Sequence, residues 1–308
     1  TMRKLSHRCS LVAVLFCSLV HGQHSPLTSH YLSNGLVINP AYAGSRDAMT
    51  ANLNYRHQWV GFEGAPVTQM VSVHAPMARR KLGLGILVYN DRIGVSQESG
   101  LFTNHAYRIR FRNGKLAFGL GAGFTVLRSQ WTSVAIQQVG DRSFAADTRS
   151  AFRPNIGTGV YYHTKSWFIG LSAPFVISHR YAANGDGWRL SDSKPDMQPM
   201  LTGGLVLAIN HDIKLKPSTL IRHRTSSGLQ ADLSTNLILK DRIWVGASYR
   251  TGDAFVASVD VLPTPQWRIG YAYDLGLSHL VAYHQGSHEL MLQYEFGYRI
   301  RVKDPRYF

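Results

Sequence analysis

Long segments in which large apolar residues alternate with small or polar ones dominate this sequence. From Leu116 to Val126 every second residue is Leu, Phe, Ala or Val, and the residues between them are Ala, Gly or Thr. Successive side chains of a β-strand point to opposite faces, so this pattern is typical of strands whose two faces meet different surroundings. Similar runs at 229–240 and 289–302 exceed the strand length usual in globular domains and suit a tilted bilayer crossing of about 9 to 11 residues.

The alternation and the turn signals between segments predict about 14 strands. They lie near 48–59, 66–75, 82–92, 98–111, 115–128, 153–163, 166–176, 199–210, 212–222, 228–239, 242–251, 254–262, 266–274 and 288–302. Single-chain bacterial barrels have an even number of strands. After residue 22 no stretch of about 18 apolar residues occurs, which excludes helical spans by length. We therefore predict an all-β fold, a transmembrane antiparallel β-barrel over residues 48–302.

The connections predict how such a barrel is oriented. Short turns such as Asn113-Gly114 and Lys240-Asp241 contrast with the longer polar segments 129–152 and 177–198. In outer-membrane barrels short turns face the periplasm and long loops face outside. Residues 303–308 are expected to form a C-terminal tail, whose final Phe308 resembles the aromatic end that barrel-assembly machinery recognises.

The first 22 residues have the organisation of a cleaved signal peptide. With Met2 as the initiator, basic residues precede an apolar segment at 11–20, and Val20-His21-Gly22 offers small residues for cleavage before Gln23. A transmembrane anchor is the alternative, but the apolar segment is about half the roughly 20 residues that a spanning helix needs. Both cysteines, Cys9 and Cys17, fall within the first 22 residues, so the exported chain would contain no disulfide and no thiolate metal ligand.

The formal charge of +15 falls to +12 when the three basic residues of the signal peptide are removed. No basic tail accompanies this charge, so we expect anionic lipid, a charged lumen or an acidic partner rather than nucleic acid. If the large apolar residues face lipid, a set of charged residues points inward: Arg56, Arg108, Arg110, Arg250, Arg268, Asp274, Glu295 and Arg299. We expect these charges to be balanced by ion pairs, by water or by a plug from residues 23–47, which could alternatively lie in the periplasm.

The sequence offers little support for catalytic or metal chemistry. The fourteen histidines form no HExxH motif, and we predict no metal site and no cofactor. Gly170-Leu171-Ser172-Ala173-Pro174 resembles a nucleophile elbow except at its last position, where Pro replaces Gly. The glycines at 119–123 resemble a dinucleotide fingerprint but are explained more simply by a narrow inner face of the barrel. We predict that the protein is not an enzyme.

Four stretches resemble one protein family in their order and spacing. They are INPAYAGS at 38–45, RHQWVGFEGAP at 56–66, GYAYD at 270–274 and GSHELML at 286–292. Together they resemble the PorP/SprF family of Bacteroidota outer-membrane proteins, which is associated with the type IX secretion system and gliding motility. The similarity extends from about residue 30 to residue 302.

The resemblance implies a non-enzymatic barrel that serves protein secretion. Family members are linked to the export of adhesins with a C-terminal sorting domain and to the attachment of periplasmic ring lipoproteins to the outer membrane. The motif positions that could bind partners are Asn39, Pro40, Gly44, Gln58, Trp59, Gly64, Pro66, His288 and Glu289. The same residues could instead set turns and strand register.

Three functions remain open at this point. The first is a secretion-system component in the outer membrane, with surrounding lipids, ring lipoproteins and secreted cargo as partners. The second is a passive porin or transporter of hydrophobic solutes. The third is an outer-membrane hydrolase that would use Ser172.

Overall fold

The computed structural model describes residues 28–77, 81–133, 147–183, 188–195, 197–224, 228–297 and 307–308. The signal peptide expected at 1–22, the first residues of the 23–47 segment and Arg299 lie outside these ranges.

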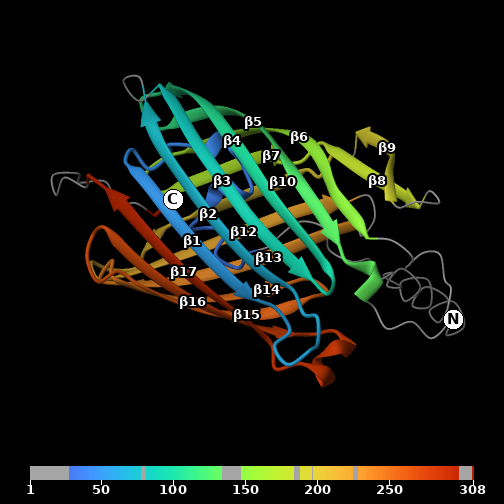
Figure 1. The fold of residues 1–308 in the computed structure, drawn as a ribbon. Helices are drawn as coiled ribbons and strands as arrows, with labels where there is room; N and C mark the ends of the chain where they lie inside the picture. Colours follow the sequence, from blue (N-terminus) through green and yellow to red (C-terminus); the bar gives the residue numbers. More distant parts are fainter. Residues whose placement is uncertain are drawn as a thin grey trace, which may run out of the picture.

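In the described part of the chain, fourteen antiparallel strands form one closed barrel (Figure 1). The strands are β1 (Met49–His57), β2 (Val67–Met77), β3 (Leu82–Ile93), β4 (Ser96–Arg110), β5 (Lys115–Ser129), β6 (Thr148–His163), β7 (Trp167–Ala173), β10 (Met200–Leu205), β12 (Ile213–Arg224), β13 (Gly228–Leu239), β14 (Ile243–Arg250), β15 (Ala254–Val261), β16 (Trp267–Gly276) and β17 (Ser287–Phe296). Pairing of β1 with β17 closes the ring, and β10 pairs with both β7 and β12. The predicted fold class is confirmed.

The two ends of the barrel differ. The turn end carries the start of β1, the end of β17 and short connections such as 111–114 and 240–242. There Lys240 and Asp241 both have positive φ, the conformation that the tightest hairpins need. The loop end carries the connections 58–66 and 277–286 and two short 3₁₀ turns, η5 (Trp131–Ser133) and η7 (His279–Tyr283).

Two segments, the loop predicted at 177–198 and the strand predicted at 199–210, differ from the sequence-based expectation. The segment predicted as a polar loop at 177–198 contains a separate hairpin, β8 (Ile177–Ala183) paired with β9 (Trp188–Pro195), outside the ring and next to β6. The strand predicted at 199–210 is divided into β10 and β11 (Leu207–Ala208). The division falls at Val206, whose backbone N–H donates to Ser166 in the turn between β6 and β7.

The side chains are arranged inversely to those of a soluble protein. Large apolar residues such as Leu53, Leu120 and Phe255 are exposed on the outer surface, whereas polar residues such as Asn54 and Glu289 are buried inside. This is the arrangement expected where hydrocarbon surrounds a barrel with a polar interior. Closure of the ring is required there, because an unpaired backbone N–H or C=O in hydrocarbon costs several kcal/mol.

A charge placed on the outer surface should destabilise the barrel according to its depth. Leu53 lies at the middle of β1 and Met77 at the last position of β2, and the two side chains are equally exposed at 48% and 49%. We expect Leu53→Lys to lower the free energy of unfolding in phospholipid bilayers by about 2–4 kcal/mol and Met77→Lys by about 0–1 kcal/mol. Denaturant titrations of both variants measure the difference, and equal losses would contradict the assignment of this surface to lipid.

Candidate functional site

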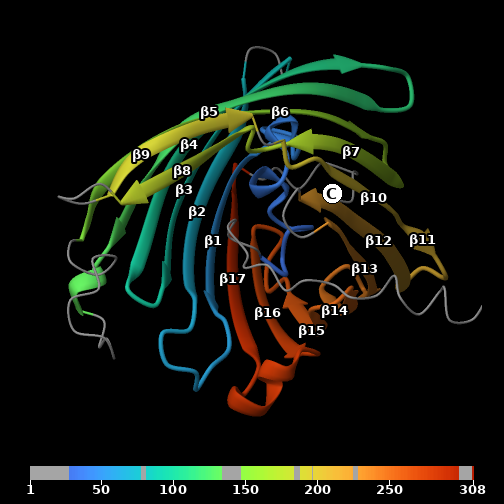
Figure 2. The same ribbon diagram turned by 90° about the vertical axis from the view of Figure 1, so that its right-hand side faces the viewer.

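The interior of the barrel is occupied by the inner segment, which we define as residues 28–47. Figure 2 shows it within the ring of strands. Every residue from Ser33 to Arg46 is buried. The segment begins beside loop-end residues of β16 and β17, where Ser29 contacts Asp274 and Glu289, and ends at the turn end, where Arg46 pairs with Glu295. It therefore crosses the lumen from one end of the barrel to the other.

Two short 3₁₀ helices, η2 (Gly35–Val37) and η3 (Pro40–Tyr42), organise the inner segment. Asn39 has an extended backbone, as a residue before proline prefers, and its side chain accepts a hydrogen bond from the N–H of Ala41 at 2.9 Å. The same side chain donates to the carbonyl of Val160 on β6 at 3.0 Å. Asn39 and Pro40 thus start a helical turn and attach it to the barrel wall.

Glycines on the inner faces of β3, β5 and β6 make room for this turn. A Cβ atom at Gly119 would lie 2.1 Å from the nitrogen of Ala41, and one at Gly83 would lie 2.0 Å from the oxygen of Ala43. A Cβ at Gly159, which faces Gly119 across the β5–β6 pair, would lie 2.2 Å from the side chain of Asn39. The narrow inner face predicted from the sequence is the surface on which η3 packs.

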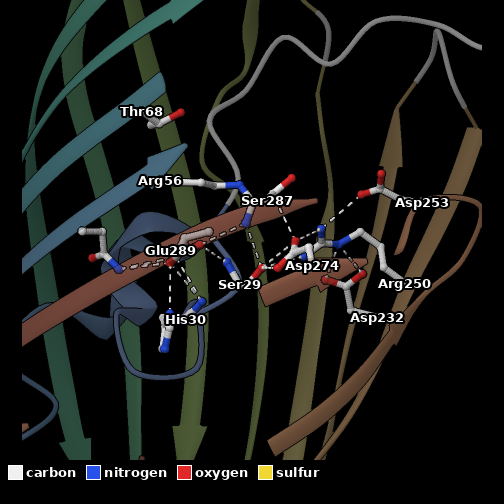
Figure 3. Close-up of polar contacts among 12 residues, drawn as sticks. Ser29, His30, Arg56, Thr68, Asp232, Arg250, Asp253, Asp274, Ser287 and Glu289 are labelled. Carbon is white, nitrogen blue, oxygen red and sulfur yellow. Dashed lines mark hydrogen bonds and ion pairs between the residues drawn. The ribbon is translucent and has the colours of Figure 1, made fainter. Parts of the chain in front are cut away.

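A network of buried charges holds the other side of the inner segment (Figure 3). Arg56 on β1 pairs with Asp274 at 2.8 Å and with Glu289 at 3.2 Å. Arg250 on β14 pairs with Asp274 at 3.3 Å and with Asp232 at 3.1 Å. Carboxylates and guanidinium groups from five strands therefore alternate through the lumen, which is the arrangement that limits the cost of burying charge.

His30 joins the inner segment to this network. Its two ring nitrogens lie 3.2 Å from Asp260 and 3.2 Å from Glu289. Ionised carboxylates only accept hydrogen bonds, so the contacts of both ring nitrogens with carboxylates require a proton on each nitrogen. The imidazole is therefore a cation at neutral pH and balances two buried anions.

The backbone and hydroxyl groups before His30 extend the contacts. The N–H of Ser29 donates to Glu289 at 2.7 Å, and the hydroxyl of Thr28 also donates to that carboxylate. The Ser29 hydroxyl lies between Arg56 and Asp274, 3.0 Å from each. Sequence reasoning missed these residues because their carboxylate partners lie more than 200 positions away and no local pattern marks the pairing.

The predicted lumen residues are placed as follows. Arg56, Arg108, Arg250, Arg268, Asp274 and Glu295 are buried inside the barrel. Arg108 donates to the carbonyl groups of Ala43 and Gly44. The guanidinium of Arg268 lies 3.9 Å from the ring centre of Trp244 and donates to Ser33. Arg110 is exposed at the end of β4.

The predicted motif residues divide between two locations. Asn39, Pro40 and Gly44 belong to the inner segment and Glu289 to the charge network, whereas the others gather at the loop end: Gln58, Trp59, Gly64, Pro66 and His288. Gly44 has a φ of +67° at the point where its backbone meets Arg108.

The loop-end motif residues join two connections into one structure. The N–H of Trp59 donates to the hydroxyl of Ser287 at 3.1 Å, and Val60 exchanges backbone hydrogen bonds with Gln285 and Gly286. The carbonyl of Gly64 accepts from Gly94 in the turn between β3 and β4. We call residues 58–66 together with 277–286 the loop platform. Among its described side chains, the exposed large apolar ones are Phe62, Leu277, Val281 and Tyr283.

The structure also bears on the two kinds of chemistry considered from the sequence, hydrolysis by Ser172 and metal binding. The Ser172 hydroxyl faces the lumen and donates to the carbonyl of Ile38 at 2.6 Å, so it holds the inner segment. No three His, Cys, Asp or Glu side chains among the described residues are grouped so that they could hold a metal ion. Within the same ranges no helix is both long and apolar enough to cross a membrane, which says nothing of a β-barrel.

The closed ring, the apolar outer surface and the polar interior define an outer-membrane β-barrel. Solved structures of such barrels resemble it. The toluene transporter TbuX of Ralstonia pickettii is 10% identical with a TM-score of 0.53, and the match covers 89% of this chain and 95% of that one. Omp33 of Acinetobacter baumannii is 9% identical with a TM-score of 0.48, over 81% and 99% of the two chains.

The family follows from the sequence match. The family model of the type IX secretion system membrane protein PorP/SprF matches residues 20–294. The chain therefore belongs to the PorP/SprF family, and the resemblance noted in the sequence is confirmed. No curated protein matches the chain significantly.

Removing one member of the charge network should destabilise the protein strongly. We expect Arg56→Met to lower the free energy of unfolding by about 3–5 kcal/mol, because Asp274 and Glu289 remain buried without their cation. The matched control is Lys115→Met, which removes a cation that is 24% exposed and paired with Asp47, with an expected loss below about 1 kcal/mol. Denaturant unfolding in detergent micelles measures the free energy of unfolding of both variants. A loss for Arg56→Met no larger than that for Lys115→Met would contradict the conclusion that the charge network stabilises the barrel.

Proposed function

We propose that this protein supports the export or surface anchoring of cargo with a C-terminal sorting domain and attaches the periplasmic ring of the type IX secretion system to the outer membrane, including where that system serves gliding motility. Membership of the PorP/SprF family over residues 20–294 supports this role. Lipids of the outer membrane would surround the barrel, ring lipoproteins would bind its turn end, and secreted adhesins or other cargo would bind its loop end.

The observation that carries the proposal is the inner segment, which lies across the lumen. The inner segment crosses the barrel from Ser29 to Arg46 and contacts the walls on both sides, through the glycines of β5 and β6 and through Asp260 and Glu289. A chain segment tied by buried ion pairs obstructs the route that a passive porin or solute transporter would need. The geometry therefore favours a protein that acts by binding partners at its surfaces rather than by passing solutes through its lumen.

The loop platform is the surface that best fits a protein partner. Phe62, Val281 and Tyr283 expose 44%, 44% and 70% of their side chains on connections that hydrogen bonds fix to each other and to Ser287. Exposed aromatic residues on a rigid support are typical of the residues that dominate protein interfaces. The motif residues Trp59 and Gly64 then build the support rather than contact the partner themselves.

A pulldown of the tagged chain from native membranes tests the proposal. We expect ring lipoproteins and sorting-domain cargo to be recovered. Purified chain in planar bilayers should show little conductance. Failure to recover any secretion component, together with porin-like conductance of the full chain, would favour the transport alternative.

Substitutions on the loop platform separate the two kinds of partner. We expect Phe62→Ser combined with Tyr283→Ser to reduce cargo recovery about tenfold or more while ring lipoproteins are retained. Phe111→Ser is the matched control, since Phe111 is similarly exposed but lies at the turn end. Equal loss of cargo in the control would contradict the assignment of cargo binding to the loop end.

A further inference from the structure

The last two described residues, Tyr307 and Phe308, lie inside the barrel at its turn end. Tyr307 is buried in an apolar cluster with Ile238 and Trp244, and the ring centres of Trp244 and Tyr307 are 6.2 Å apart. The ring of Phe308 packs on Phe168 of β7 with the centres 4.9 Å apart. Two consecutive aromatic residues thus occupy one interior cleft, where they contact Phe168 of β7, Ile238 of β13 and Trp244 of β14.

The cleft is built around the amine of Lys216, which is almost fully buried on β12. The amine donates to the carbonyl of Tyr307 at 2.5 Å. It also lies 5.1 Å from the ring centre of Phe308, 5.3 Å from Trp244 and 5.8 Å from Phe168. A buried amine needs a hydrogen-bond acceptor, and here Tyr307 supplies the acceptor while the ring of Phe308 covers the amine.

The hydroxyl of Tyr307 is recognised as well. It donates to a carboxylate oxygen of Asp241 at 2.9 Å and accepts a hydrogen bond from the amine of Lys214. Lys214 and Asp241 also pair with each other at 2.6 Å. The cleft therefore contacts Tyr307 through its hydroxyl, its backbone carbonyl and its ring, and it contacts Phe308 through its ring.

Phe308 also joins an apolar cluster to which the inner segment contributes. It packs against the apolar cluster that contains Leu36 and Tyr42 of that segment together with Phe168. Ten residues separate Phe296, the end of β17, from Tyr307, and such a length can reach about 35 Å.

We propose that the cleft lined by Phe168, Lys214, Lys216, Asp241 and Trp244 is a binding site for an aromatic dipeptide segment, Tyr followed by Phe, and that residues 307–308 occupy it as an intramolecular latch. The latch holds the inner segment at the turn end. A peptide of the same chemistry competes for the cleft once the latch is removed. This inference is independent of the proposed role in secretion.

Peptide binding to a shortened chain tests the site. The ring of strands closes between β1 and β17 at Phe296, so a variant without residues 303–308 keeps every strand pairing. We expect fluorescein-labelled Asp-Pro-Arg-Tyr-Phe to bind this variant in detergent micelles, and Asp-Pro-Arg-Ala-Ala to bind about tenfold more weakly or worse, as measured by fluorescence anisotropy. The full chain should bind the aromatic peptide about tenfold more weakly than the shortened chain, because its own latch fills the cleft.

A cleft substitution provides the control within the protein. In the shortened chain Lys216→Met should weaken binding of the aromatic peptide about tenfold, whereas Lys115→Met, at the turn end on β5, should leave it unchanged. Heat-dependent migration in gels shows whether each variant forms a barrel. If Lys216→Met does not fold, binding of the peptide Asp-Pro-Arg-Phe-Phe to the shortened chain is measured instead. This peptide should bind more weakly than the tyrosine peptide, because it lacks the hydroxyl that contacts Lys214 and Asp241. Equal binding of the tyrosine and alanine peptides, or equal binding by the full and shortened chains, would overturn the proposal.

Discussion

Pairing between the first and last strands of the barrel is the constraint on which the rest of the structure depends. The β1–β17 register runs without interruption from Met49 opposite Phe296 to His57 opposite His288. In hydrocarbon an open edge at this seam would leave a row of backbone groups unsatisfied at several kcal/mol each. Once the ring is closed, every strand has one face toward lipid and one toward an enclosed interior. The sequence alternation is the chemical consequence of that geometry.

The enclosed interior creates a second requirement, because polar side chains directed inward need partners. The inner segment satisfies it with two chemically different sides. Its apolar residues, such as Leu36 and Tyr42, pack against the small residues of β3 to β6, and its polar start, Thr28 to His30, completes the charge network of β1 and β13 to β17. Loss of the segment would leave Glu289 and Asp260 without the cation between them. Wall and segment therefore depend on each other for stability.

The sequence predicts the parts of this structure that local rules control. Alternation locates the strands because a strand's two-residue period is local, and strand parity alone directs Arg56 and Arg250 inward. The partner of His30 could not be predicted in this way, since Asp260 and Glu289 come close only when the ring closes. The sequence predicts that the glycines at 119–123 form a narrow inner face. It does not predict that Pro40 and Ala41 pack on this face, because these two residues belong to a segment that precedes the first strand. The hairpin of β8 and β9 was missed because it lies outside the ring, where no lipid-facing pattern marks its strands.

The start of β17 connects the interior with the loop platform. Adjacent residues of a strand face opposite sides, and here His288 contacts the hydroxyl of Tyr271 on the outer side while Glu289 holds Thr28, His30 and Arg56 on the inner side. The preceding Ser287 hydroxyl accepts the N–H of Trp59, so the loop platform is attached at the same point. One strand end must satisfy the buried charges, the outer face and the loop at once, and each of the three consecutive residues meets one of these requirements.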